Sequence, residues 1–218
     1  MSPRRLLTAA TSLLVVLFAH LASAAPAPPA EADSVVVLDT AQGRIVIRLA
    51  TVNAPRTCAN FRRLAATGYY DSTCFHRVVA GFVIQGGDPA SRDADPANDG
   101  AGGPGWTVPA EASLPHVRGA VAMARTPDAA NPRRDSHGSQ FYVCLADRPD
   151  LDRTGGTVFG QVIAGLDVVD RIAALGSLPG LPRSAAGANP GRRALVRRAV
   201  LEPLGRWQPA AARATPAP

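Results

Sequence analysis

The 218-residue sequence contains no lysine, so all 23 of its basic residues are arginines. Charged residues make up 18% of the chain and the formal net charge is +6. Alanine, proline and glycine are abundant, and this arginine-only composition therefore indicates genomic bias rather than a nucleic-acid-binding surface. We expect no nucleic-acid partner.

Cysteine is also scarce, with only Cys58, Cys74 and Cys144. An odd number leaves at least one thiol free unless two chains are linked. No C-x-x-C motif or Cys/His pair has the spacing of a zinc site, so we expect no metal. The sequence predicts that all three cysteines act as small buried apolar residues.

One long stretch lacks charge altogether, from Leu6 to Ala25, and it follows the pair Arg4 and Arg5. A basic start, an apolar run and the small residues 22–24 are typical of a signal peptide. We therefore expect residues 1–24 to be a cleaved signal that directs the protein to the periplasm, with no stable membrane insertion afterwards. An uncleaved membrane anchor is the alternative.

Repeated turn signals organise the rest of the chain, which contains 20 glycines and 20 prolines. A Pro/Ala linker (25–33) precedes one domain (34–204), and a disordered tail (205–218) follows it. A helix is expected after Asn53 as N-cap, and a second over 166–175. β-branched and alternating segments predict eight strands, two of them within 34–49 and the others at 74–79, 82–86, 118–124, 139–146, 157–165 and 193–204. The predicted fold is all-β, a closed eight-stranded antiparallel barrel capped by two helices.

The segment "CFHRVVAGFVIQGGD" (74–88) places an arginine among β-branched and aromatic residues. Strand alternation predicts that Phe75, Arg77 and Val79 share one face of the hairpin. Val83 and Gln85 on the returning strand are expected on this same face. A charge, an apolar wall and a neutral amide then meet on one surface. The pattern alone fits equally well a structural arginine that a glutamine caps.

Further motifs decide between these readings. The segments "FHRVVAGFVIQGGD", "GGPGWTVPAE", "MART", "GSQFYV" and "TVFGQV" occur in the order and approximate spacing of the cyclophilin-type peptidyl-prolyl cis–trans isomerases, and "MART" followed by "SQF" resembles the bacterial subgroup, exported members included. The resemblance covers residues 34–203. It implies an enzyme without a cofactor that acts on proline-containing polypeptides.

The resemblance also implies roles for single residues. The catalytic arginine of the family falls on Arg77. The positions that bind substrate fall on Phe82, Val83, Gln85, Ala124, Arg125, Gln140, Tyr142 and Leu151.

Several departures from the family pattern accompany this match. Val83 stands in place of a pocket methionine, and Arg125 in place of an asparagine. Tyr142 replaces a pocket phenylalanine, and Asp150 replaces the tryptophan of cyclosporin-sensitive members, so we expect weak cyclosporin binding. The pocket histidine has no counterpart. His116 and His137 lie in other loops and are not expected to substitute for it.

The sequence therefore predicts a monomeric, exported isomerase that rotates X–Pro bonds and assists the folding of exported proteins. A non-catalytic proline-binding chaperone that uses the same groove is the alternative. Attachment of the arginine-rich C-terminal region to the anionic cell envelope is a further hypothesis.

Overall fold

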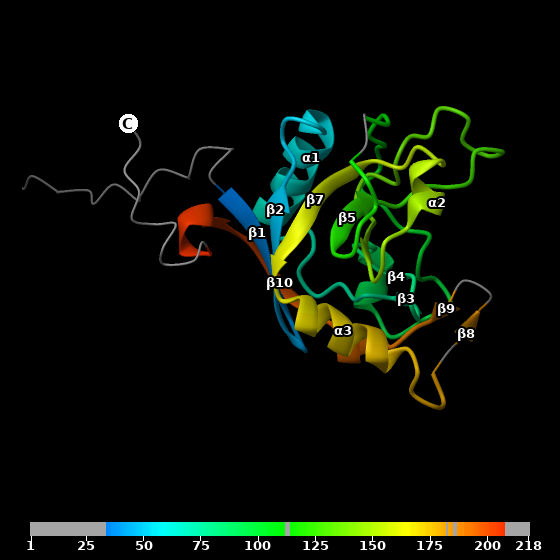
Figure 1. Ribbon diagram of the computed structural model, residues 1–218. Helices are drawn as coiled ribbons and strands as arrows, with labels where there is room; N and C mark the ends of the chain where they lie inside the picture. The colour runs from blue at the N-terminus through cyan, green and yellow to red at the C-terminus, as the bar shows by residue number, and fades with distance from the viewer. Residues whose placement is uncertain (1–33, 112–113, 182, 185–186, 208–218) are drawn as a thin grey trace, which may run out of the picture.

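The computed structural model describes residues 34–111, 114–181, 183–184 and 187–207 (Figure 1). The expected signal peptide, the linker and residues 208–218 of the expected tail lie outside this part of the chain. The strands in it are β1 (Ser34–Thr40), β2 (Gly43–Leu49), β3 (Arg77–Val79), β4 (Val83–Gly86), β5 (Ala120–Met123), β6 (Phe141–Cys144), β7 (Val158–Ala164), β8 (Arg183–Ser184), β9 (Gly187–Ala188) and β10 (Val196–Pro203). The helices are α1 (Pro55–Ala66), α2 (Pro149–Asp152) and α3 (Leu166–Leu175). No helix in these described ranges has the length and apolar character needed to cross a bilayer.

All strands belong to one antiparallel sheet in the order β10-β1-β2-β7-β5-β6-β4-β3-β9-β8. Strands β8 and β9 have two residues each, so eight longer strands form the body of the sheet. The sheet curls, and an antiparallel bridge between Cys74, before β3, and Leu195, before β10, connects two of its distant strands. The predicted all-β, barrel-like fold is confirmed, with the β8–β9 pair and the short α2 as additions.

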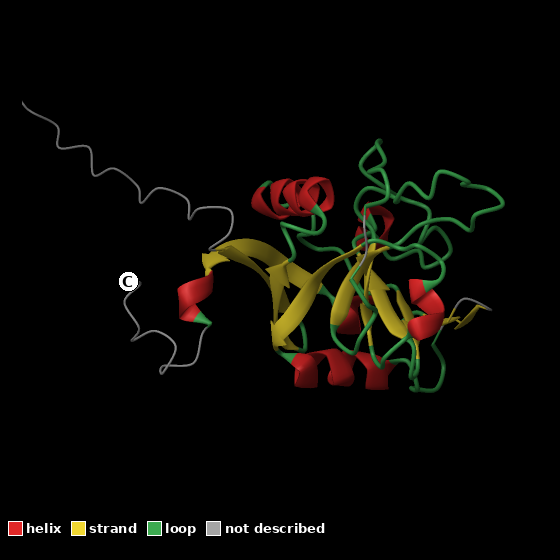
Figure 2. Cartoon of the chain, turned by 45° about the horizontal axis from the view of Figure 1, so that its top comes forward, coloured by secondary structure: helices red, strands yellow, loops and turns green. Residues whose placement is uncertain are grey.

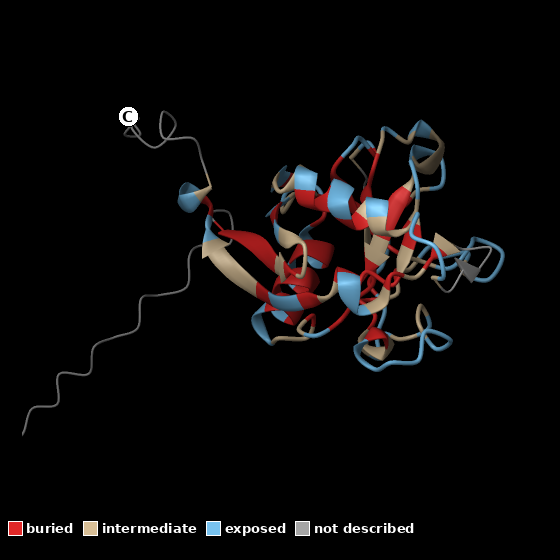
Figure 3. Cartoon of the chain, turned by 90° about the horizontal axis from the view of Figure 1, so that it is seen from below, coloured by how far each residue is buried: buried red, intermediate tan, exposed pale blue. Residues whose placement is uncertain are grey.

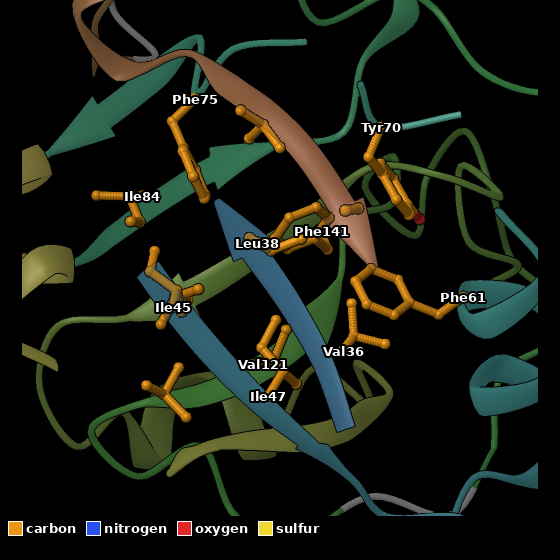
Figure 4. Close-up of a cluster of buried hydrophobic side chains, with 14 of the residues drawn as sticks. Val36, Leu38, Ile45, Ile47, Phe61, Tyr70, Phe75, Ile84, Val121 and Phe141 are labelled. Carbon is orange, nitrogen blue, oxygen red and sulfur yellow. The ribbon is translucent and has the colours of Figure 1, made fainter. Parts of the chain in front are cut away.

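The β1–β2 hairpin supplies much of the core (Figure 4). In its register Val36 faces Ile47 and Leu38 faces Ile45, and all four side chains are fully buried. Each such burial contributes about 1.5–3 kcal/mol relative to an exposed side chain. The period of two predicted this hairpin correctly.

Helices α1 and α3 lie on opposite sides of the sheet and cover the two ends of the barrel (Figure 2). Phe61 of α1 packs edge-on against Phe141 of β6, with ring centroids 5.2 Å apart. Both helices bury an apolar stripe against the core, formed by Cys58, Phe61, Leu64, Val168, Val169 and Ile172.

The start of α1 corrects one prediction. Its N-cap is Ala54 rather than Asn53. The carboxylate of Glu111 accepts hydrogen bonds from the backbone N–H groups of Arg56 (2.9 Å) and Thr57 (2.8 Å), and from the Thr57 hydroxyl (2.6 Å). A negative charge at a helix N-terminus also interacts favourably with the helix dipole. A distant loop therefore caps this helix.

The C-terminal end of the domain lies further along the chain than expected. Residues 204–206 form a 3₁₀ turn, and Trp207 packs on the outer face of the sheet beside Val37 and Val46. The Trp207 indole N–H donates to Glu202 at 3.1 Å. The expected disorder from 205 is therefore wrong for residues 205–207, because these contacts hold them to the sheet.

The three cysteines, all within the described residues, are buried and form no disulfide. Buried segments are concentrated along the strands and in the middle of the fold (Figure 3). Burial raises the pKa of the Cys74 thiol to about 11 and that of Cys144 to about 12. Both thiols therefore stay protonated and unreactive at neutral pH. Their predicted role as buried apolar residues is confirmed.

Candidate active site

The β3–β4 hairpin places an arginine directly opposite a glutamine. Arg77 pairs with Gln85 and Val79 pairs with Val83, and residues directly opposite in a ladder share a face. The Arg77 guanidinium donates from Nη1 to Oε1 of Gln85 at 3.1 Å. The predicted convergence of Arg77, Val83 and Gln85 is confirmed.

Phe75 does not share this face, and that part of the prediction is wrong. Strand β3 begins only at Arg77, so the alternation does not extend back to Phe75. Phe75 is instead fully buried in the core, with its ring 5.9 Å from that of Phe141. The apolar surface near Arg77 comes from residues on other strands.

Two glutamines and a loop fix the direction of the arginine. Gln85 accepts from Arg77 and donates from Nε2 to Oε1 of Gln140 at 2.9 Å. Gln140, fully buried, donates in turn to the carbonyl oxygens of Gly100 (2.9 Å) and Gly102 (2.8 Å). Each amide has only one orientation that satisfies this chain. Arg77 is therefore held by a neutral relay that does not cancel its charge.

The loop that ends the relay depends on a glycine. A Cβ atom at Gly102 would lie 2.1 Å from Oδ1 of Asp88. Asp88 is fully buried, and its carboxylate accepts from the backbone N–H groups of Ala90 and Gly100. The glycine-rich loop can thus approach Asp88 and bring two carbonyl groups to Gln140.

A groove with a volume of about 250 Å³ opens over Arg77. Burial lowers the pKa of Arg77, which nevertheless remains charged at any physiological pH. The Arg77 guanidinium carbon lies 5.9 Å from the centre of the Phe82 ring. Eight of the residues expected from the resemblance line the groove: Arg77, Phe82, Val83, Gln85, Ala124, Arg125, Tyr142 and Leu151. The ninth, Gln140, lies beneath it as part of the relay.

Sequence reasoning missed other residues that line the groove. They are Met123, Thr126, Pro127, His137, Thr154 and Gly156. Each lies within five residues of a position that the motifs identified. Closeness to these positions in the sequence is the signal that could have found them. His137 lines the groove from the loop before β6.

Tyr142 connects the groove to a second, buried group of polar side chains. Its hydroxyl oxygen lies 2.9 Å from Nε2 of His116, and the two rings stack with centroids 6.0 Å apart. Nδ1 of His116 lies 2.7 Å from Oδ1 of Asp152, which also accepts the His116 backbone N–H at 2.8 Å. His116 therefore supports the pocket through its contact with Tyr142, although it does not line the groove.

Comparison with known proteins identifies the family of this fold and groove. Residues 35–184 match the model of the cyclophilin type peptidyl-prolyl cis-trans isomerases. The chain belongs to this family. It is 40% identical over 139 residues to a peptidyl-prolyl cis-trans isomerase-like 1 protein of Rhizopus delemar, a match that covers 63% of this chain and 78% of that protein.

Two further relatives support this assignment of the cyclophilin domain. A peptidyl-prolyl cis-trans isomerase of Helicobacter pylori is 39% identical over 140 residues, which cover 62% of this chain and 77% of that protein. A crystal structure of a Cryptosporidium parvum cyclophilin in the presence of the dipeptide Ala-Pro superimposes with a TM-score of 0.62 and 26% identity. That superposition covers 77% of this chain and 98% of the Cryptosporidium chain.

Arg125 lines the cyclophilin groove, but its guanidinium is bound by neighbouring groups of the protein. Its guanidinium forms an ion pair with Asp128 at 2.5 Å and donates to the carbonyl oxygens of Thr126 (3.0 Å) and Thr154 (2.6 Å). Only 12% of the side chain is exposed. The charge of Arg125 is therefore satisfied within the protein.

The resemblance to the family aligns Asp150 with the tryptophan expected in cyclosporin-sensitive members. Its carboxylate accepts two hydrogen bonds from Arg148, from Nε at 2.9 Å and from Nη2 at 2.7 Å. The hydrogen bond from Arg148 lowers the pKa of Asp150 to about 2. The rim of the groove at this position is therefore an ion pair between Arg148 and Asp150.

The acidic loop 93–100 does not have the geometry of a metal site. Asp93 accepts from the side chain of Asn98 at 2.9 Å and from the backbone N–H of Asp95 at 2.8 Å. Within the described ranges no group of three or more His, Cys, Asp or Glu side chains is arranged to hold a metal ion.

Proposed function

We propose that this cyclophilin uses Arg77 as its catalytic residue and rotates X–Pro bonds in polypeptides that fold after export. One observation carries the catalytic part. A charged guanidinium is held by the neutral Gln85 at the floor of a groove whose walls are Phe82, Val83, Tyr142 and Leu151. This juxtaposition suits a reaction in which an apolar ring must be held beside a polar bond.

The reaction requires a change of conjugation rather than bond cleavage. Rotation about a peptide bond faces a barrier of roughly 18–20 kcal/mol because of its partial double-bond character. For X–Pro bonds the uncatalysed exchange takes tens to hundreds of seconds. In the twisted transition state the conjugation is lost and the proline nitrogen gains a lone pair.

Arg77 can act on that lone pair. A hydrogen bond donated to the nitrogen is stronger in the twisted state than in the planar one, and only such a difference accelerates the reaction. The planar guanidinium offers several donors, so one can meet the prolyl carbonyl while another faces the nitrogen. Gln85 and Gln140 keep the guanidinium pointed at the bond without neutralising it.

The apolar walls act on the same step. They grip the pyrrolidine ring and exclude water from the bond that turns. The twisted amide is less charge-separated than the planar one, so a dry site favours it. The low dielectric also strengthens the hydrogen bond from Arg77. The Ala-Pro dipeptide in the crystals of the Cryptosporidium cyclophilin supports proline-containing peptides as the substrate class.

An assay of proline isomerisation tests this proposal. We expect the wild type to accelerate isomerisation of an Ala-Pro peptide and Arg77→Ala to lose most of that rate. Arg198→Ala, an exposed arginine on β10, is the matched control and keeps the wild-type rate. Equal rates for wild type and Arg77→Ala would exclude this mechanism. Peptide binding without turnover by the wild type would favour the non-catalytic proline-binding module.

The proposed setting is the periplasm, where a monomeric enzyme assists the folding of exported proteins. It is supported by the basic and apolar start of the sequence and the small residues 22–24. N-terminal sequencing of the exported protein tests it. A mature chain that begins at Ala25 or Pro26 is expected, whereas a chain that keeps residues 1–24 in the membrane fraction would contradict it.

A further inference from the structure

The hydroxyl of Tyr142 poses a problem for an apolar pocket. The tyrosine ring is one wall of the groove that receives proline. A hydroxyl that faced the pyrrolidine ring would lose its hydrogen bonds with water and find no partner in the substrate. A buried polar group in that condition is unfavourable. The protein must therefore satisfy this hydroxyl elsewhere or lose affinity for proline.

The structure satisfies it from behind, through His116. The His116 side chain is fully buried, and its Nε2 lies 2.9 Å from the Tyr142 oxygen. Gly156 lies directly beside this contact, because a Cβ atom there would be in van der Waals contact with the Tyr142 oxygen (3.4 Å) and with Nε2 of His116 (3.5 Å). The hydroxyl thus lies next to an interior imidazole at the wall of the groove.

The direction of the hydrogen bonds follows from the chemistry of the three groups. Hydrogen bonds from His116 lower the pKa of Asp152, so its carboxylate is ionised at neutral pH and can only accept. Nδ1 of His116 must then carry the proton that it donates to Asp152. In the neutral imidazole Nε2 has the lone pair, and it accepts the O–H of Tyr142. Burial raises the pKa of Tyr142, so this hydroxyl keeps its proton.

We propose that His116 is a positioning residue of the proline pocket: with Asp152, it draws the Tyr142 hydroxyl into the protein, so that only the apolar ring faces the substrate. The inference rests on the proposed function of the groove. It assigns a role to a residue that does not touch the groove itself. It also explains how a tyrosine can serve at a position where the family has phenylalanine.

Helix α2 links this device to the rest of the pocket. Leu151, another wall of the groove, directly precedes Asp152 at the end of the helix. The backbone N–H of Arg148, before the helix, donates to the carbonyl oxygen of His116 at 2.7 Å. The same short helix therefore delivers one apolar wall and anchors the histidine that orients the other.

Removal of the imidazole tests the proposal. His116→Leu leaves the Tyr142 hydroxyl without its partner, and we expect kcat/KM for an Ala-Pro peptide to fall about tenfold. Most of the loss should appear as a higher KM, because a displaced ring weakens binding of planar and twisted substrate alike. His116→Leu combined with Tyr142→Phe removes the orphaned hydroxyl as well, and should recover most of the loss.

The double variant separates positioning from a purely structural role. If His116 only stabilised the fold, Tyr142→Phe would not restore kcat/KM in the His116→Leu background. That result, or an unchanged kcat/KM in His116→Leu, would overturn the proposal. Thermal unfolding, measured on the same samples, shows whether each variant is folded.

A matched pair of conservative variants keeps the test valid if His116→Leu fails to fold. The amide of glutamine reaches the place of Nε2, whereas the amide of asparagine reaches the place of Nδ1. We expect His116→Gln to keep more activity than His116→Asn, because it keeps a partner for Tyr142. The reverse order would show that the contact with Asp152 is the important one and would refute the proposal.

Peptide binding distinguishes failure of this inference from failure of the proposed function. Titration of an Ala-Pro peptide, followed by NMR, measures Kd for the wild type and for each His116 variant without any need for turnover. A wild type that binds but does not isomerise would refute the proposed function alone. A Kd that is the same in wild type and His116→Leu would refute the role of His116.

Discussion

The guanidinium carbon of Arg148 lies 4.1 Å from the centre of the Phe82 ring. Phe82 forms one wall of the groove, and Asp150 holds Arg148 over it through two hydrogen bonds. The exposed side of this wall is therefore covered by a cation that a neighbouring carboxylate keeps in place. A guanidinium over an aromatic face contributes about 0.5–1 kcal/mol at an exposed site.

Loss of this cover should weaken substrate binding. We expect Arg148→Ala to raise KM for an Ala-Pro peptide roughly two- to fivefold with little change in kcat, because Phe82 contacts proline in both planar and twisted states. Steady-state isomerisation kinetics measure the effect. Arg153→Ala, an exposed arginine just after α2, is the control and should match the wild type. A fall in kcat at constant KM would contradict this role of Arg148.

The Arg148–Asp150 pair also predicts a pH dependence of stability. Arg148 lowers the pKa of Asp150 from 3.8 to about 2 in the folded chain. As the pH falls below about 4, the unfolded chain takes up this proton first, so the contribution of the pair is present above pH 4 and is lost as the pH approaches 2. Because both side chains are partly exposed and solvent screens the pair, the effect at neutral pH is small.

Urea unfolding of wild type and Arg148→Ala at several pH values measures the contribution of the Arg148–Asp150 pair to stability. The wild type should be the more stable at pH 7, and the difference in midpoint should shrink toward pH 2, where only the contact of Arg148 with Phe82 still contributes. Arg198→Ala provides the baseline for loss of a surface charge. A difference that stays constant over this pH range would mean that the ion pair does not stabilise the fold.

Local contacts explain which parts of the site could be predicted from the sequence. Arg77 and Gln85 are eight residues apart, and the period of two in a short hairpin is enough to place them opposite each other. The same period failed for Phe75, because alternation holds only where the strand exists, and β3 begins at Arg77. The rest of the pocket came from the family motifs rather than from periodicity.

Contacts between distant segments could not be predicted from local pattern. His116 and Tyr142 are 26 residues apart and lie in a loop and a strand, so no local rule brings them together. Glu111 caps α1 across 54 residues, although Asn53 had the expected residue type and position. In both places the barrel brings a polar group from a loop to a partner that local sequence left unsatisfied.

The cap supplied by Glu111 makes a prediction about stability. Glu111→Ala leaves the backbone N–H groups of Arg56 and Thr57 without this carboxylate, and we expect the free energy of unfolding to fall by about 1–2 kcal/mol. Asn53→Ala, at the position that the sequence favoured, should change it by less than about 0.5 kcal/mol. Urea unfolding compares the two variants. Equal effects would place the cap at Asn53 after all.

The rim residue Asp150 predicts how the protein responds to cyclosporin. Members of the family that bind the drug tightly have tryptophan at this position, whereas here a carboxylate with a pKa of about 2 is ionised at every physiological pH. A charged, hydrated group loses water when an apolar ligand covers it, and it offers no ring for the ligand to pack against. We therefore expect only weak inhibition of the wild type. Asp150→Trp should tighten inhibition at least about tenfold.

Titration of the isomerase activity with cyclosporin measures both proteins. Asp150→Ala is the matched control, because it removes the charge without adding a ring, and it should fall between wild type and Asp150→Trp. If Asp150→Ala gained as much affinity as Asp150→Trp, desolvation of the carboxylate rather than the missing indole would set the affinity. Tight inhibition of the wild type would show that neither matters, and that the remaining walls of the groove hold the drug without help from this rim.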